Sequence, residues 1–329
     1  MTKSTDKYNL KTVILNYLDK LSIGKEFAKN IKPSKKSFQN IIICGMGGSA
    51  LPGEILSAYL SHEEPLSLPV IICRDYVLPK IVSKNSLIFI ASYSGNTEET
   101  ISCFKEALKL KSQIVAFSEG GEVEKMAKKA ETPHVKFSSP FPHFQPRYAA
   151  VYAFVAMHTV LRNAGIVKKT LKFPKIKTAD YENSGKELAR KIKDKTPIIY
   201  SSDALKILGL NWKIKINENS KTPAFWNYFP ELNHNEMVGF TNPRCKFFVI
   251  MLQNPDDNPK TKRRMEITAK LYKQKGLGVE VILIKGKSFM EKLLNGLALG
   301  DWVSYYLAIG YQEDPTPVKM VEDLKKELK

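Results

Sequence analysis

Two loops of glycine and hydroxyl residues, each directly after an apolar run, constrain the fold of this chain most strongly. Residues 45–49 follow the apolar run 41–44, and residues 92–97 follow the run 87–91. Each pattern predicts a buried strand that opens into a loop and then a helix. Glycine lets backbone N–H groups approach a ligand closely, and a helix N-terminus adds the positive end of a dipole. Two such loops from neighbouring strands predict a cradle for one phosphate group.

The rest of the chain alternates between strand-like and helix-like patterns. Strands are expected at 41–45, 70–73, 87–91, 114–117 and 135–137, and again at 197–202, 246–252 and 279–284. Helical patterns separate them, and Thr97, followed by two glutamates, is expected to cap one such helix through its hydroxyl. This alternation predicts an α/β fold whose sheets are mainly parallel and flanked by helices. Ligands of such sheets bind at the carboxyl ends of the strands.

Proline-rich and basic segments suggest where the chain divides. A length of 329 residues suits about two domains. We expect a first domain over 1–164, including a leading helix within 8–31, and a basic linker over 165–182. A second domain over 183–329 repeats the α/β theme more faintly and ends in a closing helix. Lys325 is expected on the same face of that helix as its apolar residues, which are Val318, Val321, Leu324 and Leu328.

Composition excludes several classes of protein. Hydrophobic residues make up 43% of the chain, so a substantial core is expected. The net charge is +18, but neither a helix-turn-helix nor a basic–aromatic RNA motif is present, so no nucleic-acid partner is expected. No apolar run approaches the roughly 20 residues of a membrane helix, and no secretory signal is visible.

The cysteines and histidines do not show the spacing of a metal site. Cys44 and Cys73 lie in strand-like runs and are expected to be small buried thiols, and Cys103 and Cys245 form no close pair with them. The five histidines lack zinc-ligand spacing. Free thiols fit a reducing compartment, so a cytoplasmic protein is expected.

With these residues in hand, the chain resembles the archaeal and bacterial bifunctional phosphoglucose/phosphomannose isomerases of the sugar isomerase (SIS) domain superfamily. The resemblance runs from about residue 10 to the end. Two of its motifs, GMGGSALPGE and SYSGNTEET, are shared by other sugar isomerase domains and imply only sugar-phosphate binding. Three others complete the match, and the last two are specific to the isomerases: QPRYAAVY, NENSKTPAFWNYFPELNHNEMVGF and DPTPVKMVEDLK.

The resemblance implies a function and a set of site residues. The implied reaction is aldose–ketose isomerisation of glucose 6-phosphate and mannose 6-phosphate to fructose 6-phosphate, without a metal or another cofactor. The implied assembly is a homodimer with a shared active site, in glycolysis and gluconeogenesis. The phosphate would be held by Gly47, Gly48, Ser49, Ser92, Ser94 and Thr97. Arg147 would stabilise the enediolate, Glu218 would move the proton, His234 of the partner subunit would assist ring opening, and Lys325 would lie near the substrate hydroxyls.

The chemistry accounts for these residue types. Removal of a carbon-bound proton needs a positioned carboxylate, and a fixed guanidinium lowers the barrier to an anionic enediolate. Histidine donates and accepts protons near neutral pH, as ring opening requires. The chain departs from the family at 201–203, where Ser-Ser-Asp replaces a glycine-containing loop, so the shape of this loop stays open. The choice of Lys325 over its neighbour Lys326 follows the alignment with a leucine–lysine pair of the family.

Other functions stay open on the residues alone. The loop at 45–49 with Asp75 after the next strand partly fits a dinucleotide-binding pattern, although the serine-rich second loop argues against it. A non-catalytic sugar-phosphate sensor would normally add a DNA-binding motif, and none is seen. An isomerase of another sugar phosphate, such as a heptose or amino-sugar phosphate, is disfavoured by the motif at 217–240.

Overall fold

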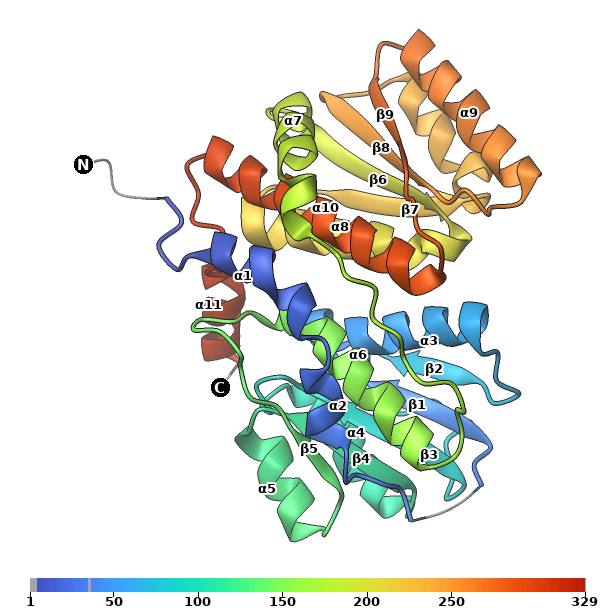
Figure 1. Ribbon diagram of the computed structural model, residues 1–329, viewed down its shortest axis with the longest axis vertical. Helices are drawn as coiled ribbons and strands as arrows, with labels where there is room; N and C mark the ends of the chain where they lie inside the picture. Colours follow the sequence, from blue (N-terminus) through green and yellow to red (C-terminus); the bar gives the residue numbers. More distant parts are fainter. Residues whose placement is uncertain (1–4, 35–36, 329) are drawn as a thin grey trace. The chain divides into compact units, whose positions relative to one another are not determined.

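The computed structural model describes residues 5–34 and 37–328 and divides them into two compact units (Figure 1). The first, here called the five-stranded unit, contains Lys20–Phe173. The second, here called the four-stranded unit, contains the described residues up to Asp19 and from Pro174 onward. The division at 173/174 falls inside the expected linker.

The five-stranded unit is a parallel sheet in the order β2-β1-β3-β4-β5. Its strands are β1 (Asn40–Cys44), β2 (Val70–Cys73), β3 (Ser86–Ala91), β4 (Gln113–Ser118) and β5 (His134–Lys136). Its helices are α2 (Ile23–Ala28), α3 (Leu51–Glu63), α4 (Glu98–Lys109), α5 (Gly121–Lys129) and α6 (Pro146–Asn163). The expected strands are all present.

Side chains alternate between the two faces of this sheet. Ile42 and Cys44 of β1 pack into the apolar cluster that α4 and α5 cover. Ile43 faces the opposite side, where Gly53 lets α3 come so close that a β-carbon on this glycine would lie 2.8 Å from the Ile43 side chain. A sheet buried on both faces explains why its strands are continuously apolar rather than alternating.

The four-stranded unit is a second parallel sheet, in the order β7-β6-β8-β9. Its strands are β6 (Thr196–Ser202), β7 (Phe225–Phe229), β8 (Phe247–Gln253) and β9 (Gly278–Leu283). Its helices are α1 (Leu10–Asn16), α7 (Glu182–Ile192), α8 (Lys206–Ser220), α9 (Pro259–Gln274), α10 (Phe289–Gly310) and α11 (Lys319–Glu327). Neither α7 nor β7 is predicted from the sequence. The strand pattern of β7 is hard to recognise because it is a half-buried aromatic strand inside a polar motif.

The leading helix differs from its expected place. It is expected in the first domain, but α1 packs against α10 and belongs to the four-stranded unit. Its apolar face, Leu10, Val13 and Ile14, is buried. One turn later the Tyr17 hydroxyl donates a hydrogen bond of 2.6 Å to Asp301 of α10. The buried Asp301 carboxylate therefore helps to hold the segment that follows α1 against α10.

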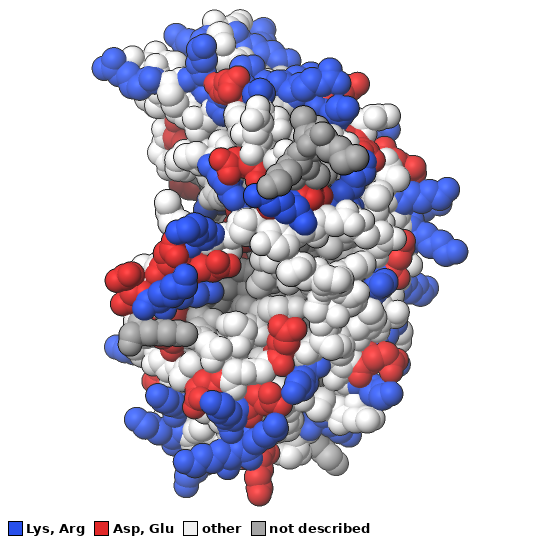
Figure 2. All heavy atoms as spheres, turned by 90° about the vertical axis from the view of Figure 1, so that its left-hand side faces the viewer, with Lys and Arg blue, Asp and Glu red and all other residues white. Residues whose placement is uncertain are grey.

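Two observations concern the molecular surface. Figure 2 shows Lys and Arg over much of the face displayed, with Asp and Glu among them rather than one continuous basic surface. Among the residues that the structure describes, no helix combines the length and the apolar character needed to cross a bilayer.

Candidate active site

The loop after β1 forms a short 3-10 helix, Gly47–Ser49, before α3. Gly47 has φ +49, a left-handed conformation that glycine adopts without steric cost. A β-carbon on Gly48 would lie 3.2 Å from the backbone nitrogen of Arg147, so the loop lies against the start of α6. The Ser49 hydroxyl accepts a hydrogen bond of 3.0 Å from the backbone N–H of Tyr93. This bond ties the loop to the one after β3.

The loop after β3 turns its hydroxyls toward one another. The side-chain oxygens of Ser92 and Thr97 lie 2.9 Å apart within hydrogen-bonding distance. Thr97 is the N-cap residue of α4 and two glutamates follow in the first turn, as expected, but its hydroxyl makes no capping hydrogen bond. The hydroxyl pairs with Ser92 instead, which is buried beneath it. Ser94 is exposed, and its hydroxyl accepts from the N–H of Asn96 at 3.3 Å.

A third loop, after β4, braces the second, and the sequence analysis missed it. Gly95 has φ +72, and a β-carbon there would lie 1.8 Å from the carbonyl oxygen of Gly120. The N–H of Glu119 donates to the Tyr93 carbonyl at 2.8 Å, and the N–H of Val123 donates to that of Gly95 at 3.0 Å. The adjacent glycines 120 and 121 after a strand were the available signal.

The first two loops and α6 enclose a small cavity in the five-stranded unit. It is lined by Gly48, Ser49, Ser92 and Tyr93 on the loop side and by Pro146 and Ala149 on the helix side. Burial and the nearby Glu119 raise the pKa of Tyr93 to about 12, so its phenol stays neutral. The hydroxyls of Ser49 and Ser92 and the start of an 18-residue helix border this space, together with apolar side chains such as Phe137. That combination suits an anion such as a phosphate.

Arg147 is the second residue of α6 and is 2% exposed. Its Nη1 donates to Oε1 of Gln145 at 3.4 Å, and its guanidinium lies 5.8 Å from the ring centroid of Tyr148. The structure thus places Arg147 beside the loops predicted to bind phosphate. A buried guanidinium is a strong electrostatic partner for an anion because few waters screen it.

Glu218 lies near the end of α8 in the four-stranded unit, where it is partly buried. The neighbouring Asn217 accepts a hydrogen bond of 2.8 Å from the N–H of Ala224, which immediately precedes β7. Lys221, with φ +54, ends the helix and donates from its Nζ to the Glu218 carbonyl at 2.7 Å. These bonds fix the backbone on both sides of Glu218.

His234 is exposed at the end of the 3-10 helix Glu231–His234 that follows β7. Residues of the same polar motif hold this loop. The Tyr200 hydroxyl donates to Oε1 of Glu236 at 2.6 Å, and Asn227 bonds the other carboxylate oxygen. Asn233 donates to the Thr268 hydroxyl at 2.9 Å. The dense polar motif thus acts as a support for the His234 loop.

Glu218 and His234 of one chain lie at opposite edges of the same sheet. β6 and β7 are parallel and in register from Ile198 with Phe225 to Ser202 with Phe229. Helix α8 starts after the carboxyl end of β6 and returns to the amino edge, a rise of about 18 Å up to Glu218. His234 follows the carboxyl end of β7. The two side chains of one chain therefore cannot meet at one substrate.

Lys325 is exposed on α11, a helix without buried residues. Its expected face contains Val321, Leu324 and Leu328, which are 45%, 59% and 56% exposed. The expectation that these residues form an apolar face is met in spacing, but that face is not covered by the described part of the chain.

Comparisons with known proteins agree with this geometry. The pattern for the bacterial phospho-glucose isomerase C-terminal SIS domain matches residues 181–328. The fold is similar to that of the C-terminal domain of glucosamine-fructose-6-phosphate aminotransferase from Francisella tularensis. The TM-score is 0.69 at 12% identity, over 95% of this chain and 100% of that one. The fold and its glycine–hydroxyl loops define a two-domain protein of the sugar isomerase (SIS) class.

Sequence similarity narrows the class further. The chain is 36% identical to a bifunctional phosphoglucose/phosphomannose isomerase of Caldicellulosiruptor bescii, over 93% of this chain and 94% of the relative. It is 35% identical to the protein of the same name from Aquifex aeolicus, with the same coverage. The chain belongs to the bifunctional phosphoglucose/phosphomannose isomerase family, and the expected resemblance is confirmed.

Proposed function

We propose that this protein interconverts glucose 6-phosphate and mannose 6-phosphate with fructose 6-phosphate by proton transfer through an enediolate. The family and the small cavity lined by Ser49 and Ser92 support this activity. The single observation that carries it is the tie between the two loops, the hydrogen bond from the Tyr93 N–H to Ser49. It holds hydroxyls of two neighbouring strands around one space.

In this proposal the phosphate is bound by Gly47, Gly48, Ser49, Ser92, Ser94 and Thr97. Binding the phosphate positions the sugar, so that part of the binding energy lowers the barrier at the distant reacting carbons. Thr97 and Ser92 share one hydrogen bond, so the hydroxyl that accepts in it keeps its own O–H free to donate to a phosphate oxygen.

The chemical step assigns one role to each remaining side chain. The Glu218 carboxylate removes the proton from C2 of the open-chain aldose and returns it to C1, which gives the ketose. Arg147 stabilises the negative charge that develops on the enediolate oxygens. His234 donates and accepts the protons that open the pyranose ring, and Lys325 hydrogen-bonds to substrate hydroxyls.

We propose further that the active enzyme is a homodimer in which His234 of one subunit completes the site of the other. The opposite-edge arrangement of Glu218 and His234 within one sheet supports this, because one chain alone cannot bring them together. The proposal also places the enzyme in the cytoplasm, in the exchange of hexose phosphates of glycolysis and gluconeogenesis. Four cysteines without disulfides are compatible with that compartment.

The activity is tested by a coupled assay of fructose 6-phosphate formation in the presence of EDTA. Glucose 6-phosphate and mannose 6-phosphate are supplied separately to wild type, Glu218→Gln and a control, Glu187→Gln, which alters an exposed acid of α7. We expect both sugars to react and kcat to fall by about 10²- to 10⁴-fold only in Glu218→Gln. A folded wild-type protein that binds both sugars without converting either would contradict the proposal and favour a sensor.

The shared site is tested by co-expressing Glu218→Gln and His234→Ala chains. Each variant alone is expected to be inactive. Random pairing gives half heterodimers, each with one intact site, so about a quarter of wild-type activity should return. No recovery from a demonstrated heterodimer would mean that the two residues do not act across subunits.

A further inference from the structure

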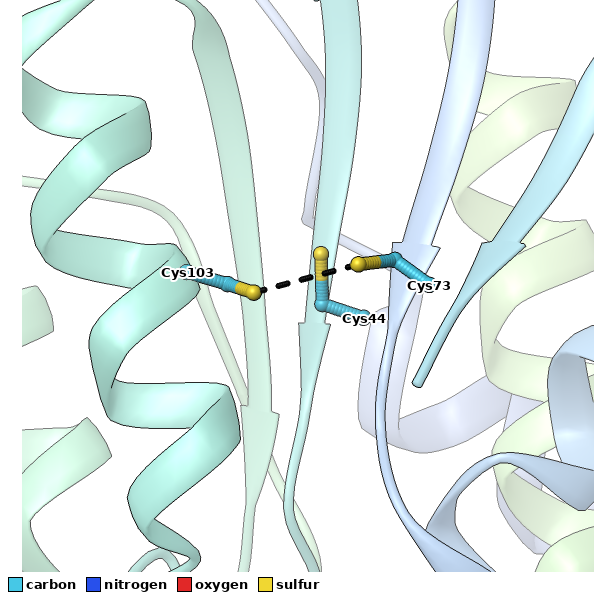
Figure 3. Close-up of side chains that lie close together, drawn as sticks. All are labelled: Cys44, Cys73 and Cys103. Atoms are coloured by element: carbon cyan, nitrogen blue, oxygen red, sulfur yellow. Dashed lines mark hydrogen bonds between the residues drawn. The ribbon is translucent and has the colours of Figure 1, made fainter. Parts of the chain in front are cut away.

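Three cysteines that are far apart in the sequence meet in the core of the five-stranded unit (Figure 3). Cys44 is the last residue of β1, and Cys73 is the last residue of β2 and its register partner. Cys103 comes from α4, which covers that face of the sheet. Their exposed fractions are 1%, 6% and 1%. No sequence pattern joins these thiols, because only the sheet pairing and the helix packing bring them together.

The three sulfur atoms have the spacing of a metal-binding group. They all lie within 4.8 Å of one another, and those of Cys73 and Cys103 are 3.9 Å apart. A metal ion bound in a plane at about 2.3 Å from each of three sulfurs holds those sulfurs about 4 Å apart. The side chains therefore need only small rotations to bind one ion.

The surroundings select a soft metal ion. Within the part of the chain that the structure describes, no histidine or carboxylate joins the group. Apolar side chains such as Leu78, Val82 and Ile90 pack in the same cluster. Zinc prefers four ligands, whereas soft thiolates without nitrogen or oxygen partners favour monovalent copper.

The thiols form hydrogen bonds with one another and with an exposed loop. Cys103 donates to the carbonyl of Asp75 at 3.2 Å, and Cys73 to that of Val77 at 3.4 Å. Asp75 and Val77 belong to the exposed loop after β2, which offers a route to the sulfurs. Hydrogen bonding with Cys103 and Cys73, together with burial, raises the pKa of the Cys44 thiol well above its usual value.

We propose that Cys44, Cys73 and Cys103 form a binding site for one monovalent copper ion, with three sulfur ligands. On binding, Cu–S bonds replace S–H bonds and the protons leave to solvent, so no electron is transferred and copper stays Cu(I). The site is separate from the proposed isomerase chemistry, which needs no metal.

The test is an anaerobic Cu(I) titration against a chromophoric Cu(I) chelator, on wild type, Cys103→Ala and Cys245→Ala. Cys245 is an exposed cysteine outside the group and serves as the matched control. We expect one Cu(I) per chain in wild type and in Cys245→Ala, and at least a hundredfold weaker binding in Cys103→Ala. Unchanged affinity in Cys103→Ala, or loss of binding in Cys245→Ala, would overturn the site.

X-ray absorption on the copper-loaded wild type keeps the test independent of whether Cys103→Ala folds. Three sulfur neighbours at about 2.3 Å are expected. A shell with nitrogen or oxygen ligands, or with two sulfurs only, would reject the three-thiolate site. The copper readouts do not involve isomerase activity, so this inference and the proposed function can fail separately.

Discussion

Both units have loops at the carboxyl ends of their parallel strands, but the residues of these loops differ in charge. In the five-stranded unit a 3-10 helix, Gly47–Ser49, follows β1. In the four-stranded unit a 3-10 helix, Asp203–Leu205, follows β6. The first carries glycines and a hydroxyl, whereas the second begins with a carboxylate that pairs with Lys206 at 3.1 Å.

The next loop repeats the contrast. Ser92 and Thr97 follow β3, but Asp256 and Asp257 follow β8. Asp256 pairs with Lys292, and the Asp257 carboxylate accepts from the Asn254 N–H at 3.1 Å. Carboxylates repel a dianionic phosphate, so the loops after β6 and β8 are less suited to bind one than the loops after β1 and β3. A parallel sheet thus supplies the position of a site, while a few loop residues determine which ligand it can bind.

The long buried helices differ in the same way. Helix α6 of the five-stranded unit buries His158, which packs against the rings of Tyr59 and Phe154. Helix α10 of the four-stranded unit buries Asp301, which pairs with Lys215 of α8. One unit thus contains a neutral titratable group and the other a buried ion pair. Four predictions follow from these contrasts, in order of decreasing effect.

Lys215→Met should produce the largest loss of stability. It leaves Asp301 as a buried charge without its ammonium partner, which typically costs about 3–5 kcal/mol of unfolding free energy. The control is Lys191→Met, which removes a surface pair with Glu280 at 3.0 Å and should cost less than about 1 kcal/mol. Urea unfolding measures both. Equal losses of unfolding free energy in the two variants would show that the buried pair stabilises the fold no more than the surface pair does.

Acid should destabilise the five-stranded unit through His158. Burial lowers the pKa of His158 to about 4, so the unfolded chain takes up a proton at a higher pH than the folded one. The stability that this histidine contributes is complete above pH 6.5 and is lost as the pH falls toward 4, by up to about 3 kcal/mol. His158→Phe should flatten this pH dependence, while His62→Gln on the surface of α3 should not. A wild-type slope retained in His158→Phe would refute the assignment.

Ser49→Ala should weaken sugar-phosphate binding about tenfold to a hundredfold, because it removes one hydrogen bond to a charged group. The matched change in the other unit is Ser202→Ala, at the end of β6, and it should leave the affinity unchanged. Isothermal titration with fructose 6-phosphate measures both. Equal effects of the two changes would break the contrast between the two sheet edges.

Gly47→Ala should give the smallest effect, a loss of about 1 kcal/mol in unfolding free energy. Its φ of +49 disfavours a side chain although nothing lies within 4 Å of the added carbon. Gly239→Ala, in the four-stranded unit, adds the same carbon into open space without a positive φ and should be nearly neutral. Thermal denaturation compares them, and equal melting temperatures would argue that the left-handed backbone at Gly47 carries no cost.

Much of the fold could be read from the chain because its signals are local. The apolar run before Gly45 and the hydroxyl run from Ser92 each predict a strand, a loop and a helix without reference to the rest of the molecule. β7 was missed because its aromatic residues lie inside a polar motif. Its extended conformation depends on pairing with β6, which lies earlier in the chain.

The candidate site likewise contains some parts that local sequence patterns predict and others that they do not. The structure joins the loops after β1 and β3, and it places Arg147 at the start of α6 beside the first of them. No local pattern gives the position of Gly120 against Gly95 or the meeting of Cys44, Cys73 and Cys103, because each depends on how separate elements pack. The relation between Glu218 and His234 required the strand register, which a sequence alone does not contain.

The docking of α1 has a consequence for the time course of synthesis. The five-stranded unit is one continuous stretch, so it can fold once residues up to 173 have left the ribosome. The four-stranded unit takes its first helix from the start of the chain, and Tyr17 must wait for Asp301, 284 residues later. At typical rates of translation this delay is on the order of tens of seconds. The nascent chain must keep the apolar face of α1 from wrong partners until its own acceptor emerges.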